Sequence, residues 1–314
     1  MAPSPVLPSD ALLRRAAGTG EPLADAVAAE LDADRAVRRQ HERALTAGAD
    51  APAVTSPAVR ALARHLEGVA RAAPDAVLLE DARANFTVPF AVHAFDVGAG
   101  ALVSSYRPPG AAAVLVGTGS LVGNAARRLQ DTARWLNAAA VPGWLRPGEP
   151  GYVETGRVRL VHALVRRSAS VPGRVEVSQL DTARTWLDFT LVAPRCAAVL
   201  GFPITEDEHR RLLRYWRVLG ELLGLDPALV AGVLERRDAE DLQARIAALT
   251  PPPSADSRRL TAAGLAAIAQ GLADVTGVPV PLARPAVRVV ARALHGRRVS
   301  RQLGIGRTGG AHLL

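Results

Sequence analysis

An arginine, a histidine and a second arginine follow one another at helical spacing in the segment TGRVRLVHALVRRS, residues 155–168. Residues three and four apart share a face of a helix, so Arg159, His162 and Arg166 project together. Valine and leucine side chains surround them and predict that this face is buried. Two neighbouring cations disfavour protonation of the imidazole, and a neutral imidazole is a common metal ligand.

The two arginines of this helix need anionic partners, because a buried and unpaired guanidinium is costly. Haem would satisfy both requirements, since its iron takes an imidazole and its two propionates match guanidinium groups. A lone histidine is more often an ordinary core or surface residue. This helix by itself therefore leaves both interpretations open.

A second segment, RRLQDTARWLN, carries polar residues at similar spacing. Arg128, Asp131 and Thr132 share one helical face. A proline- and glycine-rich loop separates them from His162, so the two helices can face each other with a cofactor between them. Asp131 is either a surface carboxylate paired with a neighbouring arginine or an acid/base group near iron-bound oxygen or peroxide.

Together these motifs resemble the latex clearing protein (rubber oxygenase) family and the related oxygenases of fungal mycophenolic acid biosynthesis. The matching residues are Arg128, Thr132, Arg159, His162 and Arg166. The segment GFPITEDEHRRLLRYWRVLGELLG at 201–224 is similar to the family's Gly-x-Pro-Ile segment and the helix start that follows it. The resemblance covers about residues 80–300.

The resemblance implies a globin-like helical core that holds one haem b, with additional peripheral helices. His162 would be the proximal iron ligand, and Arg159 and Arg166 would support it or bind the propionates. The catalytic side chains implied for the distal side are Arg128, Asp131 and Thr132.

Two departures from the family argue against polyisoprene as the substrate. Rubber oxygenases have a lysine at the position of Asp131, and this chain has no lysine. Its first residues also show no secretion signal. A late arginine that lies near the haem in the family would correspond to Arg288 or Arg292.

Two classes of function follow. The first is a haem-dependent oxygenase or peroxygenase that acts on a small apolar substrate with oxygen or peroxide. The second is a non-catalytic haem- or ligand-binding protein that has lost the reaction with the distal lysine. The sequence identifies neither the substrate nor the oligomeric state.

The elements that must position these residues are helices. Alanine, leucine and arginine dominate the 314 residues, aromatic residues make up 4%, and apolar residues recur at helical spacing. Thr205 and Glu208 form the capping-box pattern of a helix start. Helices are expected after Ser9, from Pro57, and over about 22–47, 119–140, 152–168, 179–200, 205–223, 257–275 and 283–300. The segment 75–110 is less regular and ends in a turn at Pro108, Pro109 and Gly110.

We expect an N-terminal helical extension over 1–80, a haem-binding domain over 81–303 and a mobile tail over 304–314. The segment AAAVLVGTGSLVGNAARRL could be the strand, glycine turn and helix of a dinucleotide site. The continuing helix and the break at Pro142 argue against that interpretation. Gly117 and Gly119 then serve close approach of helices.

The remaining titratable residues have structural interpretations. Cys196, the only cysteine, is expected to pack as a small buried hydrophobe and not to ligate haem as a thiolate. His93 lies in an apolar stretch near the expected pocket and is interpreted as a core residue or a donor to a ligand. His41 and His65 are expected in charged helices, and His209 in an exposed first turn.

A net charge of +8 is typical of proteins that bind nucleic acid. The arginines are mixed with acids, as in ELDADRAVRRQHER, so we expect solvated helix faces and no nucleic-acid partner. One cysteine excludes an internal disulfide. Neither a signal peptide nor a transmembrane segment is visible, and we expect a cytoplasmic protein with no membrane partner.

Overall fold

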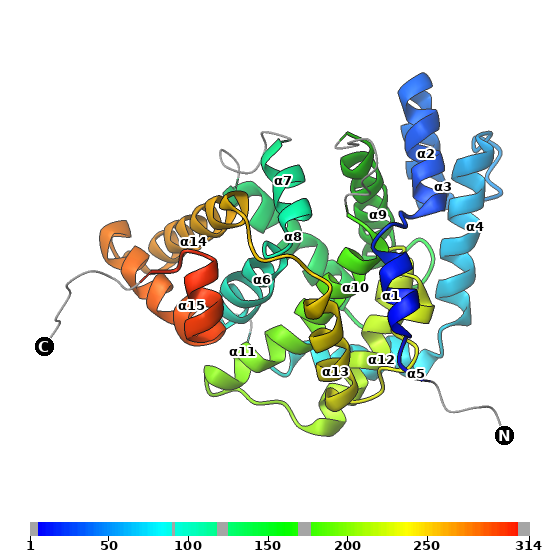
Figure 1. Ribbon diagram of the computed structural model, residues 1–314. Helices are drawn as coiled ribbons and strands as arrows, with labels where there is room; N and C mark the ends of the chain where they lie inside the picture. Colours follow the sequence, from blue (N-terminus) through cyan, green and yellow to red (C-terminus); the bar gives the residue numbers. More distant parts are fainter. Residues whose placement is uncertain (1–5, 90–91, 118–124, 169–176, 307–314) are drawn as a thin grey trace, which may run out of the picture. The chain divides into compact units, whose positions relative to one another are not determined.

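The computed structural model describes residues 6–89, 92–117, 125–168 and 177–306. These residues form helices joined by turns and contain no β-strand, as Figure 1 shows. The predicted all-α class is confirmed. Within the same ranges, none of the helices has the length and apolar character needed to cross a membrane.

Backbone contacts divide the chain into two compact units, each assembled from three stretches of sequence. Unit 1 comprises Met1–Thr87, Ala133–Trp186 and Thr205–Ala247. Unit 2 comprises Val88–Thr132, Leu187–Ile204 and Ala248–Leu314. The linear division that we expected from the sequence remains a prediction.

Unit 1 begins with helices whose starts follow ordinary capping chemistry. The Ser9 side chain accepts from the Leu12 amide, and Ser56 accepts from the Val59 amide. Thr205 and Glu208 form the predicted capping box. The helices of this unit are α1 (Asp10–Ala16), α2 (Pro22–Ala33), α3 (Ala36–Ala47), α4 (Pro57–Ala72), α5 (Asp75–Leu79), η1 (Asp81–Phe86), α9 (Pro150–Ser168), α10 (Gln179–Leu187), α12 (Glu206–Leu222), η5 (Pro227–Leu229) and α13 (Arg236–Ala248).

Two predictions about unit 1 were incomplete. The single helix expected over 22–47 is two helices, because Asp34 adopts an extended conformation and its carboxylate accepts from the Ala36 amide at 2.7 Å. This side-chain bond offers the backbone an alternative to the helix. Helices α5, η1, η5 and α13 were not expected, whereas α1, α4, α9 and α12 lie close to their predicted ranges.

The core of unit 1 forms where α2 packs against α4 and α9, and where α12 packs against η1, α4 and α9. Trp135 and Trp216 meet edge to face with ring centroids 6.4 Å apart. The Tyr215 hydroxyl donates to the Ala139 carbonyl. These contacts join α8 to α12, and Trp135 also donates to Thr155 of α9, the helix that carries His162.

Unit 2 contains two π-helical segments and a long helical hairpin. The π-helical segment η4 interrupts the helix that we expected over 179–200. The helices of unit 2 are η3 (Ala94–Leu102, π-helical), α6 (Val103–Ser105), α7 (Pro109–Gly117), α8 (Ala125–Ala140, assigned to unit 1 from Ala133), η4 (Asp188–Val192), α11 (Ala193–Val199), α14 (Ala255–Thr276) and α15 (Val280–Gln302).

The glycine run that resembled a nucleotide site does not follow a strand. Pro109 to Gly117 form helix α7, and Pro109 and Gly110 begin this helix where we expected only a turn. Proline suits a first helical turn because its missing amide is not needed there. Gly119 and the expected start of the next helix lie outside the described residues.

Candidate functional site

Helix α9 is attached to the rest of unit 1 through Arg159, which is buried. Its guanidinium donates to both carboxylate oxygens of Glu21, at 3.2 Å from Nε and 2.8 Å from Nη2. Its Nη1 atom lies 3.3 Å from the Glu221 carbonyl and 3.4 Å from the Leu222 carbonyl, at the C-terminal end of α12. One side chain thus joins the start of α2, the middle of α9 and the end of α12.

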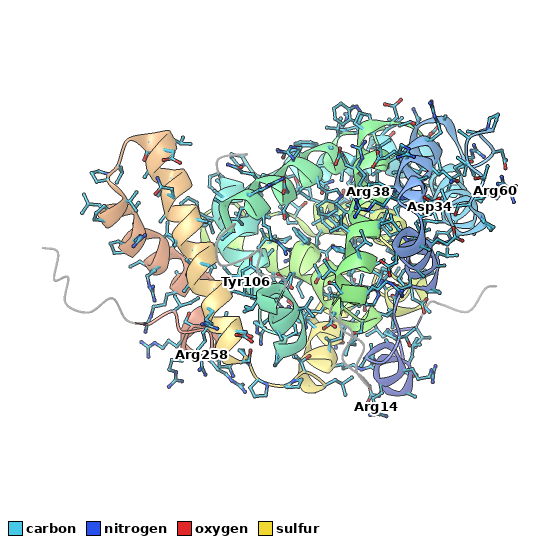
Figure 2. The ribbon with its side chains drawn as sticks, turned by 90° about the horizontal axis from the view of Figure 1, so that it is seen from above. Arg14, Asp34, Arg38, Arg60, Tyr106 and Arg258 are labelled. Atoms are coloured by element: carbon cyan, nitrogen blue, oxygen red, sulfur yellow. The ribbon has the colours of Figure 1, made fainter. Side chains whose placement is uncertain are left out.

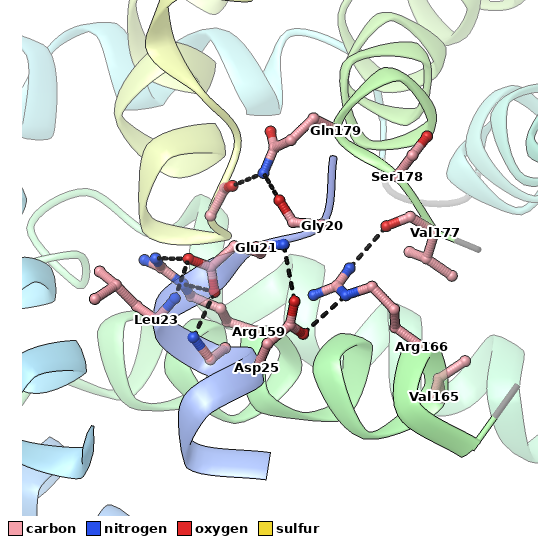
Figure 3. Close-up of polar contacts among 12 residues, drawn as sticks. Gly20, Glu21, Leu23, Asp25, Arg159, Val165, Arg166, Val177, Ser178 and Gln179 are labelled. Carbon is pink, nitrogen blue, oxygen red and sulfur yellow. Dashed lines mark hydrogen bonds and ion pairs between the residues drawn. The ribbon is translucent and has the colours of Figure 1, made fainter. Parts of the chain in front are cut away.

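Glu21 has two roles in this arrangement. Its carboxylate caps α2 by accepting from the amides of Leu23 and Ala24, and it also receives Arg159, as Figure 3 shows. Burial alone would raise the pKa of Glu21. The hydrogen bonds and the charge of Arg159 outweigh burial and hold this pKa below its usual value.

Arg166 repeats the pattern two helical turns further along α9. Its Nε atom donates to Asp25 at 2.8 Å, and its Nη1 atom donates to the Val177 carbonyl at 2.7 Å (Figure 3). Asp25 also accepts from the Glu21 amide. From the sequence we considered haem propionates as the anionic partners of these arginines. In the structure, Glu21 and Asp25 are their anionic partners.

Glycine is required where these helices meet. Gly224 has φ +89°, and a Cβ atom there would lie 2.6 Å from Glu21 Cγ and 3.0 Å from Arg159 Nε. The neighbouring Gln179 amide donates to the Gly224 carbonyl at 2.8 Å. The close approach of this turn lets the guanidinium of Arg159 reach the end of α12.

His162 lies on a different part of α9 and is half-buried. Val161, beside it, is 53% exposed, although it is apolar. A cavity of about 760 Å³ runs along this side of the helix, and its lining residues are Asp32, Val161, Leu164, Val165, Arg167 and Ser168. The expectation of a fully buried histidine face is therefore wrong. The two arginines bond to carboxylates of α2, and Val161, next to His162 in the sequence, lines the cavity, while His162 itself does not.

The three residues predicted for the distal side lie on α8 and belong to unit 2. Asp131 is 51% exposed, and Arg127 Nε lies 3.9 Å from its carboxylate. That pairing is one of the two interpretations that the sequence allowed. Thr132 and Arg128 are half-buried. Because His162 belongs to unit 1, the expected pairing of the two groups across one cofactor remains a prediction.

Arg128 has a neighbour that the sequence analysis missed. Tyr106 is buried with Ala112 and Leu260 in unit 2 and interacts electrostatically with Arg128. Burial lowers the pKa of Arg128 and raises the pKa of Tyr106. No spacing pattern could have paired them, because Tyr106 follows α6 and Arg128 lies on α8.

The other candidate side chains have structural partners. The His93 Nδ1 atom lies 3.2 Å from Asp96, which fits the interpretation of His93 as a core or supporting residue. Cys196 is buried against Gly100, and burial raises the pKa of its thiol to about 12. His41 and His209 are buried, so the expectation of an exposed His209 is wrong.

Glu21 and Asp25 are the functional-site residues that sequence reasoning missed on α2. Their spacing of four matches a helix face, but nothing in the sequence paired that face with α9. Among the residues with described positions, no group of three or more histidine, cysteine or acidic side chains could hold a metal ion.

Comparisons with known proteins agree with this all-helical arrangement. No curated protein sequence matches the chain. The solved structure of latex clearing protein LCP in the closed state matches with a TM-score of 0.63 at 18% identity. The match covers 98% of this chain and 80% of that one, and it supports a shared fold.

A family model gives the more specific result. The model described as the catalytic domain of ER-bound oxygenase mpaB/B' and rubber oxygenase matches residues 90–313. This range is well over half of the chain and includes both α8 and α9. The chain therefore belongs to the mpaB/B' and rubber oxygenase family.

Proposed function

We propose that this protein is a haem-b-dependent oxygenase or peroxygenase that acts on a small apolar substrate. Membership of an oxygenase family supports the class of reaction. The observation that carries the haem proposal is the half-buried imidazole of His162 on α9, next to the exposed side chain of Val161. Within this proposal, residues 81–303 form the haem-binding domain, which agrees with the range of the family match.

The residues of α9 fit a haem group. His162 offers an imidazole on a half-buried surface, and Val161 and Val165 offer apolar contacts for a porphyrin beside it. When bound, haem iron would supply the redox chemistry that activates oxygen or peroxide. His162 is the proposed protein ligand to the iron.

Arg159 and Arg166 are positioning residues in this proposal. Both are bonded to carboxylates of α2 and to backbone carbonyls, so they fix the rotation of α9 about its axis. Since His162 lies between them in sequence, a fixed rotation also fixes the direction of the imidazole.

Arg128, Asp131 and Thr132 are the proposed catalytic residues. The Asp131 carboxylate can hold or transfer a proton, the Thr132 hydroxyl can donate a hydrogen bond, and Arg128 can stabilise developing negative charge. Their common helix supports a shared role. Turnover measured separately with oxygen and with peroxide identifies the oxidant.

A haem measurement tests the first step of the proposal. Protein produced with sufficient iron should contain close to one haem b per chain in a pyridine haemochrome assay. His162→Ala should lose haem or change its spectrum severely, because no other residue of α9 is an imidazole. Folded protein that takes up no added hemin would contradict the proposal.

Two further variants distinguish the roles. Asp131→Ala should keep the haem and the proximal histidine signature but change reactivity with peroxide. His93→Ala serves as the control because its ring is already paired with Asp96. Normal haem binding in His162→Ala together with loss in His93→Ala would move the ligand to the other histidine.

A second candidate function is the binding of haem or another ligand without catalysis. The 51% exposure of Asp131 and its partner Arg127 suit a protein that binds haem or another ligand without catalysis. Turnover of an apolar compound with oxygen or peroxide by the haem-loaded protein would exclude this alternative. Stable haem binding without turnover of any compound would support it.

A further inference from the structure

The positive charge of this protein is concentrated at one end of the sequence. Residues 1–274 contain 31 arginines and 30 acidic residues and are almost neutral. Residues 275–314 contain seven arginines and no acidic residue. The excess charge thus belongs to α15 and its flanking segments, which corrects the expectation of arginines balanced along the whole chain.

Helix α15 packs one face on the rest of unit 2, and its other positions are half-buried or exposed. Ala283, Val287 and Ala291, spaced by four, are buried in the core that α15 forms with α14 and η3. The two helices lie side by side as a hairpin in Figures 1 and 2. The buried stripe is narrow and fixes which side chains of α15 point away from the protein.

One stripe of α15 is cationic. Arg284, Arg288 and Arg292 share a face by their spacing of four; Arg284 is exposed, and the other two are half-buried. The helix is kinked at Gly296, which has φ +67°, and two exposed arginines, Arg297 and Arg298, follow the kink. No ion pair joins any arginine of α15 to an acidic residue in the part of the chain that the structure describes. Arg288 donates to the Gly304 carbonyl at 3.2 Å, a bond that leaves its charge unneutralised. The charges of this helix can therefore attract an external anion.

Exposed apolar side chains accompany the arginines. Val275, Val278 and Leu282 surround the turn between α14 and α15 and form the hairpin tip. Val275 is 87% exposed and Leu282 is 63% exposed. Val289 continues the apolar stripe seven residues after Leu282 and is also exposed. Exposed apolar groups of this kind at one site indicate an interaction surface.

We propose that the α14–α15 hairpin binds the surface of membranes that contain anionic phospholipids. The arginines of α15 would contact headgroup phosphates, and the hairpin tip would enter the boundary between headgroups and acyl chains. Cationic and apolar side chains on one helix are typical of interfacial binding. The charge fits an anionic surface, while the apolar tip fits lipid better than the hydrated backbone of a nucleic acid.

This proposal concerns a surface contact and no spanning segment. We expected no membrane partner because no segment of the sequence is long and apolar enough to cross a bilayer. A helix that lies in the interface needs only one apolar stripe. The proposal is independent of haem and of the reaction.

Vesicle flotation of the full chain tests the proposal. The protein should float with vesicles of phosphatidylcholine mixed with phosphatidylglycerol and remain unbound with phosphatidylcholine alone. High salt should weaken binding by screening the charges. If the wild-type protein does not float with the anionic vesicles, the proposal is wrong.

Two variants separate the contributions of charge and apolar contact. Arg284→Ala/Arg297→Ala/Arg298→Ala should weaken binding roughly 100-fold, since each cation near an anionic surface contributes about fivefold. Val275→Ser/Leu282→Ser should weaken it about tenfold or more by removing apolar burial. Neither variant changes a residue that we assign to the haem site.

Matched controls remove the same groups elsewhere. Arg38→Ala/Arg39→Ala/Arg43→Ala deletes three exposed arginines of α3, of which Arg38 is labelled in Figure 2. Phe86→Ser/Val199→Ser deletes two exposed apolar side chains. Both controls should bind vesicles like the wild type.

The controls also define the results that would overturn the proposal. Equal losses in the α3 and α15 arginine variants would indicate a general charge effect. Displacement from vesicles by duplex DNA, with no effect of the Val275→Ser/Leu282→Ser change, would identify a nucleic-acid surface instead. Circular dichroism of each variant verifies that it is folded.

Discussion

At the scale of single residues, the ion pair of Glu21 and Arg159 has the largest expected effect on stability. Both groups are buried and are bonded to each other through two contacts. Arg159→Met would leave the Glu21 carboxylate in the core without its cation, and we expect a loss of about 3–5 kcal/mol in the free energy of unfolding. Urea denaturation measures this loss.

The exposed pair of Arg167 and Asp32 provides the matched control for that change. It joins the same two helices, α9 and α2, but both of its side chains are about half-exposed. Arg167→Met should cost about 1 kcal/mol or less. Equal losses from Arg159→Met and Arg167→Met would contradict the role of burial.

His41 gives a prediction about pH. Burial lowers its pKa to about 4, and its Nε2 atom is buried without a hydrogen-bond partner in the described structure. Between pH 6.5 and 4 the unfolded chain binds the proton and the folded chain does not, so stability falls as pH falls through this range. The full effect is about 3 kcal/mol.

His41→Leu should remove most of this pH dependence. The free energy of unfolding is measured for the wild type and the variant at pH 5 and at pH 7.5. Between pH 7.5 and pH 5, the wild type should lose more stability than the variant. His65 and His295, whose pKa values are also lowered by burial, account for a residual slope. An unchanged slope in His41→Leu would contradict the assignment.

At the scale of elements, the turn after α12 determines how closely α2 and α9 approach. Gly224→Ala would place a methyl group against Glu21 and Arg159 and would also strain a backbone with φ +89°. We expect a loss of at least about 3 kcal/mol from strain and displaced contacts together. Thermal or chemical denaturation measures it.

Gly201 isolates the backbone contribution to that loss. It has φ +91°, but a Cβ atom there would meet no heavy atom within 4 Å. Gly201→Ala should therefore cost only about 1–2 kcal/mol from the left-handed conformation. The difference between the two variants measures the close approach at Gly224, and equal losses would argue against it.

At the scale of the whole molecule, paired carboxylates make the fold sensitive to acid. Interactions with arginines lower the pKa values of Glu21, Asp10, Asp50 and Glu206. Each contributes stability that is fully present above its unfolded pKa and is lost as pH falls through the folded value. We expect acid unfolding to steepen below about pH 4.5, as circular dichroism during an acid titration would reveal.

Local chemistry in the sequence determined the helices and several of their starts. The caps at Ser9, Ser56 and Thr205 depend on side chains within three residues, so sequence spacing was enough to predict them. The same is true of the shared face of Arg159 and Arg166. The family resemblance, built on these spacings, is confirmed by the match over residues 90–313.

Only the tertiary structure decided what those side chains contact. Glu21 and Arg159 are separated by 138 residues, and no local pattern pairs such distant positions. Helical spacing places the two arginines on one face, but it does not determine whether their anionic partner is a haem propionate or a carboxylate of α2. The packing of α2 on α9 supplied the carboxylates and left His162 half-buried, because ion pairs between helices depend on how whole elements pack.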